Sequence, residues 1–206
     1  MRNPPDLPGK RDRGDGLAWV LFLGAPSTGK TTLARRLAEM YDTVWMPEYG
    51  REYWQIFQQG RRLSLEQLVE IAEVHRERDV ELASRARRFL FVDTDARTTR
   101  LFAFDYYGRS HPRLDVLADA ADERYDVVFL CEDDIPYDDT PERSGEQHRT
   151  TFHGWVRDDL DTRGVDYVRL TGPVDVRLAR VQEVLARRFP CSSHSTGGPL
   201  RGPEKN

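Results

Sequence analysis

Cysteines and long apolar runs are scarce in this sequence of 206 residues. Its two cysteines, Cys131 and Cys191, are too few for a disulfide framework and lack the spacing of a zinc site. No run approaches the roughly 20 apolar residues of a membrane-spanning helix, and the run 17–23 also lacks the cleavage site of a signal peptide. We therefore expect a cytoplasmic protein that does not bind a membrane.

An excess of charge of one sign is also missing. The 31 Lys and Arg residues nearly balance the 35 Asp and Glu residues, which gives a formal charge of -4 and argues against nucleic-acid binding. Most of the histidines show no metal-ligand spacing and are predicted to be surface residues: His75, His148, His153 and His194. We expect a small molecule as the partner, and the oligomeric state stays open.

The chain between two Pro- and Gly-containing ends has the length of one domain. Residues 1–16 and 191–206 are predicted to be disordered tails, and residues 17–190 to form the domain. Short apolar runs alternate there with helical patterns, which is typical of β-α units around a parallel sheet. Predicted strands are 18–23, 43–46, 89–92, 126–131 and 166–170, and predicted helices are 30–40, 64–87, 97–107, 112–123, 146–162 and 174–188.

Two details refine this pattern. The strands 18–23, 89–92 and 126–131 are largely or wholly apolar, which indicates that helices cover both faces of the sheet. Ser64 followed by Gln67 predicts a capping box at the start of the second helix.

A glycine-rich turn joins the first predicted strand to the first predicted helix. Gly24 and Gly29 let the backbone approach phosphate oxygens closely, and the helix adds the positive end of its dipole. Lys30 supplies a point charge for the β and γ phosphates, and the Thr31 hydroxyl can ligate Mg²⁺. The residues predicted to bind ATP are Gly24, Ala25, Pro26, Ser27, Thr28, Gly29, Lys30, Thr31 and Thr32. The turn predicts the three-layer α/β/α fold of P-loop NTPases, with a mainly parallel five-stranded sheet and a lid.

A Mg²⁺ ion held by one hydroxyl needs a carboxylate, usually at the end of a neighbouring strand. Asp93 directly follows the predicted strand 89–92 and is the candidate ligand beside Thr31. Asp95 points to the same side as Asp93 if the chain stays extended there. Asp95 is therefore a candidate catalytic residue, with an N-cap of the next helix as the alternative.

The class of P-loop protein follows by elimination. The guanine-reading string Asn-Lys-x-Asp of GTPases is absent, and a motor or AAA-type machine is normally larger. A small kinase remains, and it needs an acceptor pocket, a base for the acceptor hydroxyl and a cationic lid.

The acceptor pocket is predicted after the second strand, where carboxylates, a guanidinium and aromatic rings follow one another. This segment falls at the carboxyl edge of the sheet, where open α/β folds bind ligands. Glu48 is predicted to orient or deprotonate the acceptor hydroxyl, and Arg51 is a further substrate contact. Tyr49 or Trp54 is predicted to stack on a ring. The alternative is the start of a helix that turns Tyr53 and Trp54 into the core, and we favour this alternative for Trp54 but not for Glu48.

A second polar and aromatic loop is predicted to complete the pocket with Tyr106, His111 and Asp115. His111 precedes a proline, so a structural turn histidine is an equal alternative for it. A loop-stabilising aspartate is the alternative for Asp115.

The lid is predicted over residues 132–149. Arg143 and Arg149 are the catalytic candidates there, because a guanidinium can stabilise the charge of the transferring phosphoryl group. The alternative is a solvated loop followed by a helix start that Ser144 caps.

Several of these segments, in this order and spacing, resemble the ribosylnicotinamide kinase domain of the NadR-type family. The matching strings are residues 24–32, Glu48-Tyr49-Gly50-Arg51-Glu52, Phe91-Val92-Asp93-Thr94-Asp95 with Thr98-Thr99, Tyr107-Gly108 with His111-Pro112 and Leu114-Asp115, and Arg143-Ser144 with Gln147 and Arg149. The resemblance covers roughly residues 17–188, and the two acidic strings are specific to few families. The lid departs from the family pattern at Pro141-Glu142, where the family tends to have a glycine nearby.

The resemblance implies that Mg-ATP phosphorylates the 5′-hydroxyl of nicotinamide riboside, which gives nicotinamide mononucleotide for NAD salvage. Family members often add a DNA-binding domain and a nucleotidyltransferase domain, and we expect neither activity from this polypeptide. The pyridinium cation of this substrate suits the faces of Tyr49, Tyr106 or Trp54 and an acidic neighbour, for which Asp115 is the candidate.

Two other functions stay open at this stage. The same scaffold can serve a kinase for another small nucleoside or alcohol. A non-catalytic nucleotide-binding adaptor is the second, although Lys30, Thr31 and Asp93 argue against it.

Overall fold

The computed structural model describes residues 16–57, 62–137 and 146–190. The predicted tails, apart from Gly16, lie outside the described residues, and so does Arg143 of the predicted lid. Among the helices of these described ranges, none has the length and apolar character needed to cross a membrane.

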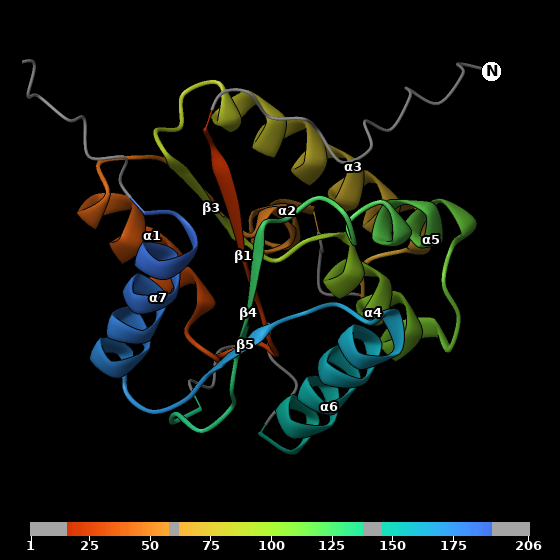
Figure 1. Ribbon diagram of the computed structural model, residues 1–206. Coiled ribbons are helices and arrows are strands. Elements are labelled where there is room, and N and C mark those ends of the chain that lie inside the picture. The colour runs from red at the N-terminus through yellow and green to blue at the C-terminus, as the bar shows by residue number, and fades with distance from the viewer. Residues whose placement is uncertain (1–15, 58–61, 138–145, 191–206) are drawn as a thin grey trace, which may run out of the picture.

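Five strands form one sheet, and each pairs with its neighbours in parallel (Figure 1). The strands are β1 (Ala18–Leu23), β2 (Trp45–Met46), β3 (Phe89–Asp93), β4 (Val127–Cys131) and β5 (Val168–Leu170), in the order β2-β3-β1-β4-β5. In the register of β1 and β3, Phe22 lies opposite Asp93. The turn after β1 and the aspartate that ends β3 therefore meet at one edge of the sheet.

Helices cover both faces of the sheet and complete the predicted three-layer fold. They are α1 (Lys30–Met40), α2 (Tyr49–Phe57), α3 (Leu65–Ala83), α4 (Ala96–Tyr107), α5 (Pro112–Asp119), α6 (Glu146–Arg163) and α7 (Val174–Arg188). The predicted bounds of α1 and α7 are confirmed. α3 and α5 both end four residues before the predicted position.

The alternation of side chains along the strands divides the core in two. Val20 and Phe22 of β1 face α1 and α7, where they pack with Leu37 and Val181. Leu21 and its neighbours on the other face pack with the five helices α2 to α6. Figure 1 shows these two helical layers on opposite sides of the sheet.

The segment after β2 is helix α2, which the sequence offered only as an alternative reading. Tyr49 and Tyr53 are one helical turn apart and both are buried, and the Tyr53 hydroxyl donates to Glu70 of α3 at 2.6 Å, so α2 packs beside α3. The predicted capping box of the next helix is confirmed: Gln67 N–H donates to Ser64 Oγ at 3.2 Å, and Ser64 N–H donates to Gln67 Oε1 at 2.9 Å.

Candidate active site

The loop between β1 and α1 depends on two glycines. Gly24 has a φ of 142°, and a Cβ there would lie 2.5 Å from the carbonyl oxygen of Cys131, a separation that side chains do not tolerate. Gly29, with a φ of 82°, is the left-handed residue from which α1 begins. Both positions require glycine, and the loop packs tightly against the end of β4.

The polar groups of this loop point inward. Lys30 is buried, and its Nζ donates to the carbonyl oxygen of Ala25 at 2.8 Å across the loop. The hydroxyl of Thr28 donates to the same oxygen at 2.8 Å. The loop thus curls around the ammonium group at the N-terminal end of α1, where a phosphate is favoured by both the charge and the helix dipole.

Asp93 lies next to this loop, at the end of β3. The Thr31 hydroxyl donates to Asp93 Oδ2 at 2.5 Å, whereas the buried Oδ1 has no hydrogen-bond partner among the described residues. Burial raises the pKa of Asp93 to about 6; the Lys30 ammonium lowers it, and the Glu48 carboxylate adds to the rise. The Asp93 oxygen and the Thr31 hydroxyl are of the kind that the oxygen-rich coordination of Mg²⁺ requires.

A cavity opens beside the loop and extends to a group of aromatic side chains. It encloses about 900 Å³ of space when the open mouth is included. Pro26 of the loop and Thr94 after β3 line one end, and Trp54, Phe102 and Tyr106 line the wall. The remaining lining residues are Glu48, Gly50, Arg51, Leu63, Leu68, Ile71, His75, Thr98, Thr99 and His148.

Three of the predicted acceptor residues line this cavity. Glu48 is the carboxylate among the lining residues, and its Oε2 lies 4.0 Å from Nη2 of Arg51. Burial raises the pKa of Tyr106 to about 12, and the nearby Asp105 and Glu48 carboxylates raise it further while Arg62 lowers it. Trp54 also lines the cavity and is half-buried, so its assignment to the core was only partly right.

Tyr49 does not line the cavity. Its ring is buried under the guanidinium of Arg78, whose Cζ lies 4.1 Å from the ring centroid. Stacking of Tyr49 on a substrate ring is therefore incompatible with this arrangement, because the ring already packs in the core.

Asp95 takes the alternative role of a helix cap. The chain is not extended before it, because Thr94 has a φ of 65°. Asp95 Oδ1 accepts from Arg97 N–H at 3.0 Å, and Oδ2 accepts from the Arg97 guanidinium at 2.9 Å. Both partners are buried, and Asp95 is not among the residues that line the large cavity.

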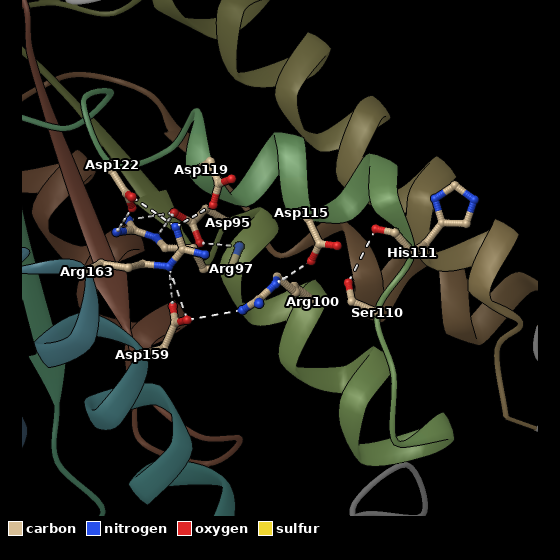
Figure 2. A network of polar contacts seen from close by, with 10 residues as sticks. All are labelled: Asp95, Arg97, Arg100, Ser110, His111, Asp115, Asp119, Asp122, Asp159 and Arg163. Atoms are coloured by element: carbon tan, nitrogen blue, oxygen red, sulfur yellow. Dashed lines mark hydrogen bonds and ion pairs between the residues drawn. The ribbon is translucent and has the colours of Figure 1, made fainter.

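His111 and Asp115 are likewise not among the residues that line the cavity. His111 caps α5 by accepting from Arg113 N–H through Nδ1 at 3.0 Å. Asp115 accepts from Arg100 Nε at 2.7 Å. Arg100 also reaches Asp159 of α6, which bonds Arg163, so an ion-pair network joins α4, α5 and α6 (Figure 2).

Arg149 of the predicted lid is buried beside the phosphate loop. Its Nη1 donates to the carbonyl oxygen of Ile135 at 2.9 Å, and a Cβ on Gly29 would lie 3.4 Å from the Ile135 side chain. The buried Nε of Arg149 finds no acceptor in the part of the chain that the structure describes. One donor of this guanidinium is thus unpaired among the described residues.

The prediction that the histidines are surface residues is wrong for His75 and His153, which are buried, whereas His148 is partly exposed. His75 is buried, lines the cavity and places Nε2 3.3 Å from the Asp93 carbonyl oxygen; burial lowers its pKa. His148 lines the cavity and contacts Asp105 at 2.9 Å, and His153 is buried against Glu132 at 2.9 Å. His194 lies outside the described residues. Helical spacing from Leu68 and Ile71 could have placed His75 on the buried face of α3.

Fold and site together define a P-loop protein with a kinase-like small-molecule cavity. A family model described as an AAA domain matches residues 19–177, and the chain belongs to this family. The small size of the chain argues against a large AAA-type motor. It does not argue against membership of this AAA domain family.

The chain is also homologous to NadR proteins. It is 31% identical to the trifunctional NAD biosynthesis/regulator protein NadR of Escherichia coli over 155 residues, which are 73% of this chain and 37% of that protein. It is 30% identical to the NadR of Salmonella typhimurium over 171 residues, 81% of this chain and 41% of that protein. The chain thus spans about two fifths of the length of these relatives.

Solved structures show the same fold. A NadR protein in complex with NR has a TM-score of 0.66 at 24% identity, over 84% of this chain and 51% of that one. A NadR protein in complex with NAD and AMP-PNP has a TM-score of 0.65 at 24% identity, over 91% of this chain and 52% of that one. A deoxyadenosine kinase from M. mycoides has a TM-score of 0.59 at 10% identity, over 82% of this chain and 99% of that one.

Proposed function

We propose that this protein transfers the γ-phosphoryl group of ATP to the 5′-hydroxyl of nicotinamide riboside, which yields nicotinamide mononucleotide and ADP. The observation that supports this most is the continuity of the cavity. Pro26 of the phosphate loop and the aromatic side chains of Trp54 and Tyr106 line one and the same space. A riboside can therefore place its ring on the aromatic wall while its 5′-hydroxyl reaches the phosphate end. The relatives named for NAD biosynthesis agree with this substrate.

The triphosphate is proposed to bind in the loop of residues 24–32. Its oxygens would displace the Ala25 carbonyl as the partner of Lys30, whose charge already lies inside the loop. Thr31 and Asp93 would hold Mg²⁺, because the free Oδ1 of Asp93 and the Thr31 hydroxyl are adjacent. When bound there, Mg²⁺ would help to neutralise the negative charge of the phosphate groups.

Glu48 is the proposed base for the acceptor hydroxyl. In the transfer, the 5′-oxygen forms a bond to the γ-phosphorus, the bond from that phosphorus to the bridging oxygen of ADP breaks, and the hydroxyl proton passes to Glu48. Asp95, the other candidate, has both oxygens engaged by Arg97. Arg149 and Arg143 are proposed to stabilise the transferring group, and the spare Nε of Arg149 beside the loop supports that role for the first.

The cationic ring of the substrate suits the wall of the cavity. A cation over an aromatic face gains roughly 0.5–2 kcal/mol, which alone gives a preference of up to a few tens of fold. Glu48 lines the cavity, and Asp105 contacts the cavity-lining His148 at 2.9 Å. We propose these two carboxylates, in place of Asp115, as the source of any larger preference for a charged ring.

The test is release of ADP from Mg-ATP with a panel of ribosides. We expect a far higher kcat/KM for nicotinamide riboside than for thymidine, adenosine or uridine. Reduced nicotinamide riboside has nearly the same shape and a neutral ring, so it isolates the contribution of the charge. Equal rates on thymidine and nicotinamide riboside would refute the substrate and leave a kinase. Absence of ADP release with every acceptor, despite nucleotide binding, would favour the adaptor.

A further inference from the structure

A fully buried arginine of α7, a helix on the face of the sheet opposite the helices that line the cavity, contacts the loop between β1 and α1. Arg177 belongs to the first turns of α7, and only 1% of it is exposed. A guanidinium is costly to bury unless its donors are paired. The groups that accept hydrogen bonds from this guanidinium therefore indicate its role.

Within the described ranges, the side-chain hydrogen bonds of Arg177 go to loops at the carboxyl edge of the sheet. Nε donates to the Gly172 carbonyl oxygen at 2.7 Å, Nη1 to the Thr28 carbonyl oxygen at 2.8 Å and Nη2 to the Glu132 carbonyl oxygen at 3.0 Å. Nη2 also donates to Asp134, whose other oxygen accepts from Gly172 N–H at 2.7 Å. One side chain thus joins the phosphate loop to the loops that follow β4 and β5.

The bond to Thr28 has a consequence for the phosphate loop. The Thr28 carbonyl and the Gly29 N–H belong to one peptide, and in a planar trans peptide these groups point in opposite directions. Because Arg177 holds the carbonyl on the α7 side, the Gly29 N–H is directed away from Arg177. A phosphate loop binds its ligand through such N–H groups, so their direction before binding matters.

We propose that Arg177 is a positioning residue for nucleotide binding: it orients the Thr28–Gly29 peptide and fixes the two adjoining loops around it. Arg177 acts through the backbone and touches neither the acceptor cavity nor its lining residues. The inference rests on the proposed nucleotide site of the same loop. Its substitution therefore weakens nucleotide binding selectively and leaves riboside binding unchanged.

The test compares Arg177→Met with Arg180→Met, an exposed arginine of the same helix that pairs with Glu183. The readouts are the Kd of AMP-PNP with Mg²⁺, the Kd of nicotinamide riboside and the melting temperature. We expect Arg177→Met to raise the Kd of AMP-PNP roughly ten- to a hundredfold, as loss of other positioning contacts does. Arg177→Lys keeps the positive charge but lacks the planar guanidinium, so its Kd of AMP-PNP should lie between those of the wild type and Arg177→Met. The Kd of nicotinamide riboside should be the same in Arg177→Met as in the wild type. Arg180→Met should have wild-type values of all three readouts.

An unchanged Kd of AMP-PNP in folded Arg177→Met would overturn the inference, and so would an equal loss of both ligands. If Arg177→Met does not fold, Asp134→Asn weakens the same junction from a half-exposed position. That variant should raise the Kd of AMP-PNP several-fold, and no change would overturn the inference. A wild type that binds AMP-PNP but phosphorylates no riboside would refute the proposed function alone.

Discussion

The two helical layers of the molecule are built differently. In α1 and α7 the buried side chains are apolar except Lys30 and Arg177, and both of these serve the phosphate loop. The layer of α2 to α6 buries His75, Asp79, Arg97 and Arg149, and it holds the large cavity. One layer therefore stabilises the sheet mainly by apolar burial, whereas the other combines that burial with the polar contacts of the candidate site. Substitutions should separate these two kinds of contribution.

The largest effect should come from Lys30, where the two layers meet at the phosphate loop. Lys30→Ala should reduce phosphotransfer by about a thousandfold or more, since one cation on the transferring group contributes roughly 10³–10⁵. Lys30 is buried, so the melting temperature should be measured beside the turnover number. Arg35→Ala, an exposed position of the same helix, is the control. Near wild-type turnover in folded Lys30→Ala would remove the nucleotide site from this loop.

A large effect on catalysis alone is expected from Glu48 on the cavity side. Glu48→Gln keeps the shape and removes the base, which should lower kcat by roughly 10²–10⁴ with little change in stability. Glu52→Gln is the matched control, because Glu52 lies in the same segment and pairs with Arg78 outside the cavity. Equal activity of the two variants would show that Glu48 is not the base.

Asp95 should behave in the opposite way. Asp95→Asn removes the nearer carboxylate of the buried Arg97 and leaves Asp122 at 3.5 Å, and breaking a buried pair costs roughly 3–5 kcal/mol. We expect urea unfolding to show this loss, while kcat of the folded variant changes far less than in Glu48→Gln. A loss of kcat without a loss of stability would return Asp95 to the catalytic residues.

The apolar layer should give the cleanest effect on stability. Leu37 of α1 is fully buried, so Leu37→Ala should lower the free energy of unfolding by about 3 kcal/mol through the cavity it leaves. The KM of the acceptor should stay at its wild-type value, since Leu37 packs on the opposite face of the sheet. A raised acceptor KM in this variant would contradict the division between the layers.

The same contrast explains what could be predicted from the sequence. The bounds of α1 and α7 followed from regular apolar spacing, because those helices mainly cover the sheet. The phosphate loop was also predictable, since its chemistry lies within one short segment. The sequence did not decide between a helix and a binding loop for the segment of α2, because its aromatic residues suit both a buried core and the wall of a binding site.

The acceptor side of the site was harder to predict from the sequence, because the contacts of its polar residues depend on partners that are distant in the sequence. Glu48, Arg51 and Tyr106 line the cavity, but Asp115 is bound by Arg100 and Asp95 by Arg97. A local pattern places a carboxylate near a site and does not show which arginine of the folded chain will reach it. Arg177 was missed for the same reason, since its acceptors come from three separate loops.

The most direct test of the acceptor site is tryptophan fluorescence during titration with nicotinamide riboside in the absence of nucleotide. Trp54 lines the cavity, and contact with a pyridinium ring should quench its emission. We expect saturable quenching in the wild type and in Trp155→Phe, a variant of a partly exposed residue of α6, and loss of most of it in Trp54→Phe. Quenching that is unchanged in Trp54→Phe, or that never saturates in the wild type, would contradict binding of the riboside in this cavity.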